Sequence, residues 1–325
     1  MKFPSRRSWL ALLSVGFIYA GTVVAQDYPA RAIRIVVPFP PGGSTDVIFR
    51  ILAPRLAENL GQQVVIDNRS GGLGTIGWDL VAKSRPDGYT LGAVIIPFVA
   101  NPFLISKMPY DTEKDLAAVS LVAQAPFMLV VHPSVPARSV KELIALAKAR
   151  PGSLNYGSAG NASASHLATE LFIDVTGARM VHVPYKGGGP QVVSAVGGEV
   201  AVLLVPIPAA IGHIMSGRLV PLGISALKRD STLPKVPTIA EAIGVPDFEI
   251  SEWQGAVVAT GTPNAVINRL HQEFVKTLAL PEVKERIAGV GSRAVGSTPE
   301  ELATHLNKER AKWSKVIKAA AIRIE

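Results

Sequence analysis

Three glycine-containing turns carry the residues whose types and spacing suit the binding of an anion. They span residues 38–47, 155–166 and 184–190, and each follows a short apolar segment and precedes a segment with helical spacing of apolar residues. Free backbone N–H groups and the helix dipole favour an anion at a helix N-terminus, and glycine lets a bound group approach the backbone. The turns therefore predict a site for a small carboxylate; a capped helix start that binds nothing is the alternative at each turn.

The expected ligand-binding residues lie in these turns and beside them. In the first turn two glycines precede Ser44 and Thr45, one of which begins the helix, and in the third turn Lys186 could balance a carboxylate. Apolar residues next to the turns favour a ligand with an apolar or aromatic body. The expected set is Phe39, Pro41, Gly42, Gly43, Ser44, Thr45, Asp46, Phe98, Ser158, Ala159, Asn161, Ser165, His166, Tyr185, Lys186, Gly187, Gly188 and Ile207.

Catalytic and metal-binding residues are not expected. Ser165 and His166 are adjacent, and neighbouring side chains on a helix point about 100° apart, so they do not form a nucleophile and base pair. The chain has no Gly-x-Ser-x-Gly motif and no cysteine, which excludes thiol catalysis and thiolate metal sites. Its histidines are scattered, at positions 132, 166, 182, 213, 271 and 305. A periplasmic hydrolase is kept only as a weaker alternative.

Residues 72–77 spell G-x-G-x-x-G, the form of the dinucleotide-binding fingerprint. Five residues, 67–71, separate this motif from the end of the preceding expected strand, whereas the fingerprint needs its first glycine in the tight turn itself. We therefore expect no nucleotide and no other cofactor. These glycines are interpreted as allowing a helix to start and to pack closely.

The first 25 residues have the pattern of a secretory signal peptide. Lys2, Arg6 and Arg7 precede an apolar run at residues 9–20, and small residues lead to Ala25. Even extended to Ala25, the run is shorter than the roughly 20 apolar residues that span a bilayer. We predict export to the periplasm with cleavage near Ala25. The paired arginines fit a twin-arginine signal as well as the general export route.

The charge of the exported chain does not favour a nucleic-acid partner. Loss of 25 residues and three positive charges from a 325-residue chain of net charge +8 leaves 300 residues and +5. No run of Lys or Arg interleaved with aromatic residues follows, as a nucleic-acid backbone would require. The modest basic charge instead suits solubility and a bias toward small anions.

Short β-branched segments alternate with segments of helical spacing, which predicts an α/β fold with mostly parallel sheets covered by helices on both faces. Helices are expected after Ser139 and Thr298, each followed three residues later by a glutamate that completes a capping box, and after Thr262-Pro263. The expected strands lie at residues 33–37, 63–66, 90–94, 118–122, 127–132, 154–156, 180–183, 200–205 and 219–224.

Two breaks suggest where the chain passes between domains. The stronger is Ala125-Pro126, and the second is a proline-rich stretch at residues 233–246. If the chain crosses at both breaks, residues 26–125 and 248–325 form domain I and residues 126–247 form domain II. The C-terminal helices then complete domain I.

The mature chain resembles the substrate-binding proteins of tripartite tricarboxylate transporters, the Bug or TctC family. The resemblance rests on eight short segments in the same order, at residues 28–29 with 33–46, 86–90, 110–111 with 114–116, 151–156, 165–168, 183–190, 233–238 and 253–255. It implies a two-domain Venus flytrap of the type II-like class with the ligand in the cleft. It also implies a carboxylate held by backbone donors and ordered waters, without a bound cofactor.

The family's three ligand-binding loops map by motif to residues 40–46, 158–165 and 185–189 of this chain. The resulting hypothesis is a monomeric periplasmic protein that captures a small monocarboxylate or dicarboxylate, including one with an aromatic body. It would deliver this ligand to the membrane subunits of a transporter. A sensor that reports the carboxylate to a membrane kinase is the alternative with the same fold.

Overall fold

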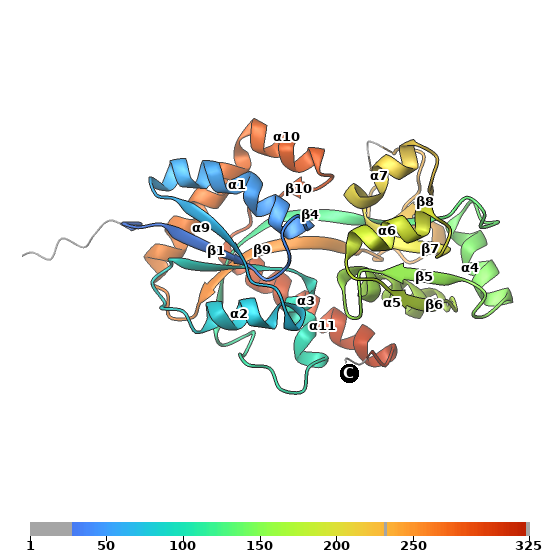
Figure 1. Ribbon diagram of the computed structural model, residues 1–325, viewed down its shortest axis with the longest axis horizontal. Coiled ribbons are helices and arrows are strands. Elements are labelled where there is room, and N and C mark those ends of the chain that lie inside the picture. The colour runs from blue at the N-terminus through green and yellow to red at the C-terminus, as the bar shows by residue number, and fades with distance from the viewer. Residues whose placement is uncertain (1–27, 231–232, 323–325) are drawn as a thin grey trace, which may run out of the picture.

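Two groups of strands and helices, joined by two long strands, make up the structure (Figure 1). The structure is a computed structural model that describes residues 28–230 and 233–322. The predicted signal peptide and its cleavage point lie outside the described residues. Among the helices that are described, none has both the length and the apolar character that crossing a bilayer requires.

The first group is built on three parallel strands in the order β2-β1-β3. In this sheet Ile35 of β1 lies between Ile66 of β2 and Leu91 of β3. The helix α1 follows β1 directly, so the first glycine-containing turn sits at the carboxyl end of a central parallel strand. The elements are β1 (Ile33–Val37), α1 (Ser44–Leu60), β2 (Val64–Asn68), α2 (Thr75–Ala82), β3 (Thr90–Val94) and α3 (Ile96–Ala100).

The second group repeats this plan with parallel strands in the order β6-β5-β7. The second and third turns follow β5 and β6 and therefore lie side by side at one edge of the sheet. The elements are α4 (Val140–Ala149), β5 (Asn155–Ser158), α5 (Ala164–Thr176), β6 (Val181–Pro184), α6 (Gly188–Val196), β7 (Val202–Pro206), α7 (Ile207–Met215), β8 (Val220–Ile224) and α8 (Ile239–Ile243).

The strands β4 (Leu116–Val131) and β9 (Ser251–Ala259) connect the two groups. They pair antiparallel from Leu116 opposite Ala259 to Pro126 opposite Ser251. From Phe127 onward, β4 pairs instead with β7 and β8. The antiparallel ladders of the described sheet all involve β4 or β9, whereas the pairs within each group are parallel.

The strand predictions are confirmed in location, since each of the nine segments overlaps a strand, but two details are wrong. Residues 118–122 and 127–131 belong to one continuous strand, so Ala125-Pro126 does not end a strand. Proline is tolerated there because Pro126 stands at the last pair of the β9 ladder, where a missing N–H costs little. The strand β9 was not predicted.

The remaining helices follow β9 and end near the junction of the two groups. They are α9 (Asn264–Ala279), α10 (Pro281–Gly289) and α11 (Pro299–Ala319), with the short strand β10 (Arg293–Ala294) between the last two. The predicted caps Ser139 and Thr298 are confirmed, and Thr298 forms a complete capping box with Glu301. The box predicted at Ser139 is not complete, because Glu142 accepts the N–H of Arg138 instead. The helix predicted after Thr262-Pro263 is confirmed as α9, with Pro263 at its N-cap and the hydroxyl of Thr262 donating to the carbonyl of Ala259.

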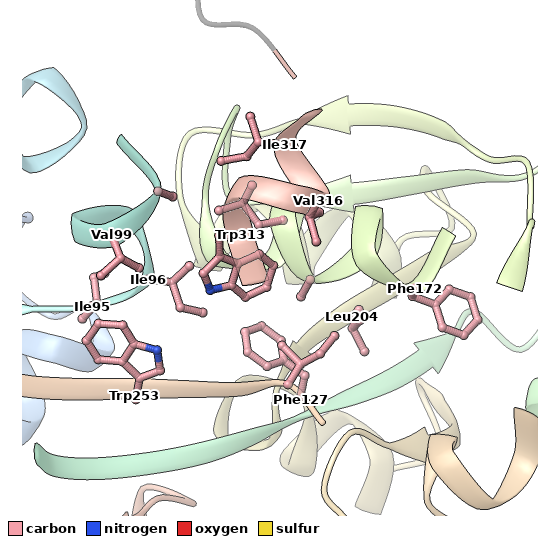
Figure 2. Packing of buried hydrophobic residues seen from close by; sticks show 14 of the residues in the cluster. Ile95, Ile96, Val99, Phe127, Phe172, Leu204, Trp253, Trp313, Val316 and Ile317 are labelled. Atoms are coloured by element: carbon pink, nitrogen blue, oxygen red, sulfur yellow. The ribbon is translucent and has the colours of Figure 1, made fainter. Parts of the chain in front are cut away.

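The helix α11 packs against both groups and extends one hydrophobic core across their junction. Figure 2 shows Trp313 of α11 close to Ile96 of α3 and above Phe127 of β4. The indole N–H groups of Trp313 and Trp253 both donate to Oε2 of the buried Glu309, at 2.8 and 2.9 Å. The C-terminal helix also contacts α5 of the second group as well as α3 of the first. The division at residues 125/126 and 247/248 stays a prediction.

Ser225 joins the two segments that pass between the groups. Its fully buried hydroxyl accepts the N–H of Phe127 at 2.7 Å and donates to the carbonyl of Ile250. We expect Ser225→Ala to lower the free energy of unfolding by about 1–3 kcal/mol, because it leaves two buried backbone groups unpaired. Urea unfolding measures the change. The exposed Ser216→Ala is the matched control, and equal effects of the two variants would contradict the assignment.

Candidate functional site

The start of α1 presents backbone donors without acceptors. Gly43 is the N-cap and offers no side-chain oxygen, and Pro40 and Pro41 before it have no N–H group. In the part of the chain that the structure describes, no acceptor binds the N–H groups of residues 43–46. Residues 41–44 are exposed. This end of a 17-residue helix can therefore hold an anion by backbone donors alone.

Asp46 holds this turn in shape. Its buried carboxylate accepts the N–H of Gly42 at 2.9 Å, Nε of Arg50 at 2.9 Å and Nδ2 of Asn68 at 3.0 Å. Burial alone would raise the pKa of Asp46, but the hydrogen bonds from Arg50, Gly42 and Asn68 hold it below its ordinary value. Its oxygens are thus engaged within the protein. We interpret this predicted ligand-binding residue as one that orders the turn.

The second turn satisfies most of its own donors. The N–H of Ala159 binds Oγ of Ser165 at 3.0 Å, and the N–H of Ala162 binds Nδ1 of His166 at 3.0 Å. Both side chains are buried and shape the turn from within. Asn161 is the exposed member of the predicted set in this turn. The second turn consequently offers fewer free donors than the first.

Two stacked histidines lie beneath the second turn. The rings of His166 and His182 are 3.9 Å apart and tilted by 6°, and Nε2 of His182 lies 2.6 Å from Oγ of Ser158. The hydroxyl of Tyr156 donates to Glu170, which lies 3.9 Å from Nε2 of His166. Burial and the neighbouring His182 lower the pKa of His166 to about 4. Burial lowers the pKa of His182 as well, so both imidazoles are neutral near pH 7.

Sequence reasoning tested Ser165 with His166 and missed the pair of Ser158 with His182. The second pair comes from neighbouring strands, β5 and β6, and no local pattern joins residues 24 positions apart. Ser158 is fully buried, and Glu170 neighbours His166 rather than His182. The pair therefore lacks both access for a substrate and a carboxylate to orient the base, which a hydrolytic triad needs.

The third turn also precedes an uncapped helix. Gly187, at φ 106°, is the N-cap of α6 and donates its N–H to the carbonyl of Ala159 at 3.1 Å, which ties the third turn to the second. No acceptor within the described residues binds the N–H groups of Gly188 and Gly189. Lys186 is exposed beside them. Tyr185 is half-buried, with its hydroxyl 3.4 Å from Glu199.

The three large apolar residues of the predicted set lie at different depths. Phe98 is fully buried, with Trp78 and Tyr110 packed against its ring, and Ile207 is buried in the core of the second group. Neither offers a surface to a ligand in this structure, because the packing that fixes each side chain also covers it. Phe39 is half-buried against Trp78. It is the apolar side chain best placed beside the first turn.

One polar contact to the first turn was missed by sequence reasoning. Oγ of Ser44 donates to Oε1 of Glu252 at 2.9 Å, although the residues are 208 positions apart. A buried glutamate in a strand could have drawn notice, but β9 itself was not predicted. Among the described residues, no group of three His, Asp or Glu side chains is arranged to hold a metal ion.

Two α/β groups joined by paired strands, with donor-bearing turns at strand ends, define a periplasmic binding protein. A solved Rhodopseudomonas palustris protein with adipate is similar, with a TM-score of 0.83 and 37% identity, covering 92% of this chain and 100% of that one. MatC from Rhodopseudomonas palustris with bound malate has a TM-score of 0.79 and 29% identity, covering 89% and 100%.

The chain belongs to the tripartite tricarboxylate transporter receptor family, TctC, whose family model matches residues 48–322. The protein BugT of Bordetella pertussis is 39% identical over 321 residues, which are 97% of this chain and 98% of that protein. The family consists of substrate-binding receptors and not of enzymes. The resemblance drawn from the sequence is confirmed.

The stacked histidines make stability depend on pH. Because His166 has a folded-state pKa of about 4, below its unfolded value of 6.5, its contribution is complete above pH 6.5 and is lost as pH falls toward 4. On acidification from pH 7 to pH 5, we expect the free energy of unfolding of the parent protein to fall by roughly 2 kcal/mol more than that of His166→Asn. Asparagine keeps an acceptor for the N–H of Ala162.

Urea unfolding at the two pH values measures this difference. His132→Asn, which changes a histidine outside the stacked pair, serves as the control and should follow the parent. If His166→Asn loses as much stability as the parent on acidification, the buried neutral ring is not the cause.

Proposed function

We propose that this periplasmic binding protein captures a small carboxylate and delivers it to the membrane subunits of a tripartite tricarboxylate-type transporter. The observation that carries the proposal is the uncapped start of α1, with free N–H groups at residues 43–46. Such donors suit a compact anion and need no buried cation. The adipate and malate in two similar structures support the same ligand class.

The surroundings of the first turn favour a ligand with an apolar or aromatic body. Phe39 lies beside the free donors, and the nearby Asp46 and Arg50 neutralise each other. We infer that a monocarboxylate or dicarboxylate places one carboxylate at α1, while its far end meets the third turn, with Lys186 and the free N–H groups of α6. Closure would then bend β4 and β9, and a monomer suffices for capture and handover.

A thermal-shift panel tests the ligand class. Binding to the folded state alone stabilises by about 2.7 kcal/mol at a hundredfold excess over Kd, which corresponds to a melting shift of roughly 5–10 °C. We expect the clear shifts among aliphatic and aromatic acids, with adipate and malate included. Phosphate, which also binds helix N-termini, is the control. Shifts with phosphate or neutral sugars alone, using protein stripped of ligand by refolding, would rule out a carboxylate receptor.

Substitutions in the first and third turns separate backbone binding from side-chain binding. Gly43 has φ −73° and an added Cβ would meet only the carbonyl of Pro40, at 3.6 Å, so Gly43→Val should fold. We expect it to weaken carboxylate binding more than tenfold by blocking approach to the free donors. Lys186→Ala should weaken the binding free energy for a carboxylate by about 1–2 kcal/mol at most, which is the scale of one hydrogen bond to a charged group.

Calorimetry with a carboxylate that shifts the melt measures both effects. Gly289→Val is the matched control, since an added Cβ there meets nothing within 4 Å and the residue lies at the end of α10, away from the predicted site. Loss of binding in Lys186→Ala with normal binding in Gly43→Val would mean that side-chain charge, not the backbone, holds the anion.

A further inference from the structure

A buried glutamate links the crossing strand to the first turn. Glu252 is the second residue of β9, opposite Ala125, next to the point where β4 changes its partners. It is 8% exposed, and its Oε1 accepts the hydroxyl of Ser44 at 2.9 Å. Ser44 is the first helical residue of α1 and carries one of the free N–H groups. A side-chain bond therefore fixes the anion-binding end of α1 to the strand that joins the two groups.

This bond determines what Ser44 can offer to a ligand. A hydroxyl has a single proton, and here it is donated to Glu252, so Ser44 can donate to an anion only through its backbone N–H. The same bond orients the first turn of the helix. The carboxyl thus acts on the ligand through Ser44 and does not need to touch the ligand itself.

The charge state of Glu252 matters because the carboxyl lies beneath donors that receive an anion. Burial raises its pKa, and this effect exceeds that of the hydrogen bond from Ser44, which lowers it. A neutral carboxyl still accepts from Ser44, whereas an ionised one would repel an incoming carboxylate.

Within the described residues no ion pair involves this carboxyl, and Arg293 of β10, which pairs with β4 close by, donates to Oε1 of Gln124 instead. The neighbouring strands β3 and β4 carry no charged residue. On α1, Asp46 pairs with Arg50, and on α2, Asp79 pairs with Lys83. Glu309 of α11 binds the indole of the next residue of β9, which faces the opposite side of the strand.

We propose that Glu252 is a positioning residue, a buried acid whose hydrogen bond with Ser44 holds the start of α1 in place for a carboxylate ligand. This inference rests on the proposed function. Because an anion at α1 and a proton on Glu252 favour each other, the affinity for a carboxylate should fall as the pH rises.

The test compares the parent, Glu252→Gln and Glu252→Ala by calorimetry with adipate and malate at pH 6 and pH 8.5. Glutamine keeps a neutral acceptor for Ser44, so this variant should bind within twofold of the parent at pH 6 and change less than twofold at pH 8.5. The parent should weaken at least threefold over the same range. Glu252→Ala, which removes the acceptor, should bind at least tenfold more weakly at both pH values.

Urea unfolding of the same variants without ligand supplies an independent readout. A folded-state pKa above the unfolded value means that stability is complete below the unfolded pKa and is lost as the pH rises. Glu252→Gln should therefore gain stability relative to the parent between pH 5 and pH 8. If the difference in unfolding free energy between Glu252→Gln and the parent does not change between pH 5 and pH 8, Glu252 does not have a raised pKa in the folded state. If Glu252→Ala folds and binds carboxylates as well as the parent, Glu252 is not a positioning residue. If no carboxylate of the thermal-shift panel binds the parent, the proposed function fails, while the unfolding data still decide the charge state of Glu252.

Discussion

The antiparallel pairing of β4 with β9 is the constraint on which the rest of the structure depends. One continuous β4 pairs with β9 up to Pro126 and with β7 and β8 from Phe127, so the same strand belongs to both groups. The return strand β9 lies beside it, and their shared ladder keeps the groups together. Any relative motion of the groups must bend this pair near residues 125–127 and 250–252.

Neighbouring side chains of β9 point to opposite faces of the sheet, so two polar contacts of this strand lie on opposite faces. Glu252 reaches Ser44 at the start of α1, whereas Trp253 reaches Glu309 of α11. On the α11 side, Trp313 continues the apolar core from one group into the other (Figure 2). The crossing strand thus connects the first glycine-containing turn to the C-terminal helix, and bending at the junction must accommodate a packed indole.

The N-cap residue distinguishes the turns. Ser163 caps α5, and its side chain accepts the N–H of His166, so one backbone donor at that helix start is already paired. Gly43 and Gly187 cap α1 and α6 without a side-chain oxygen. A serine cap satisfies a donor that a glycine cap leaves to the solvent or a ligand. The similar glycine-rich sequences of the three turns therefore have different capacities for an anion, with α1 and α6 the better candidates.

The sequence alone determined most of the local elements, the caps at Ser139 and Thr298, the glycine-containing helix start of the first turn and the family. These depend on neighbouring residues, whose periodicity and turn chemistry can be seen directly. Only the tertiary structure decided that β4 is continuous, that Phe98 lies in the core, that Ser158 meets His182 and that Glu252 holds Ser44. Each of these depends on strand pairing or packing between distant segments, which local residue preferences do not specify.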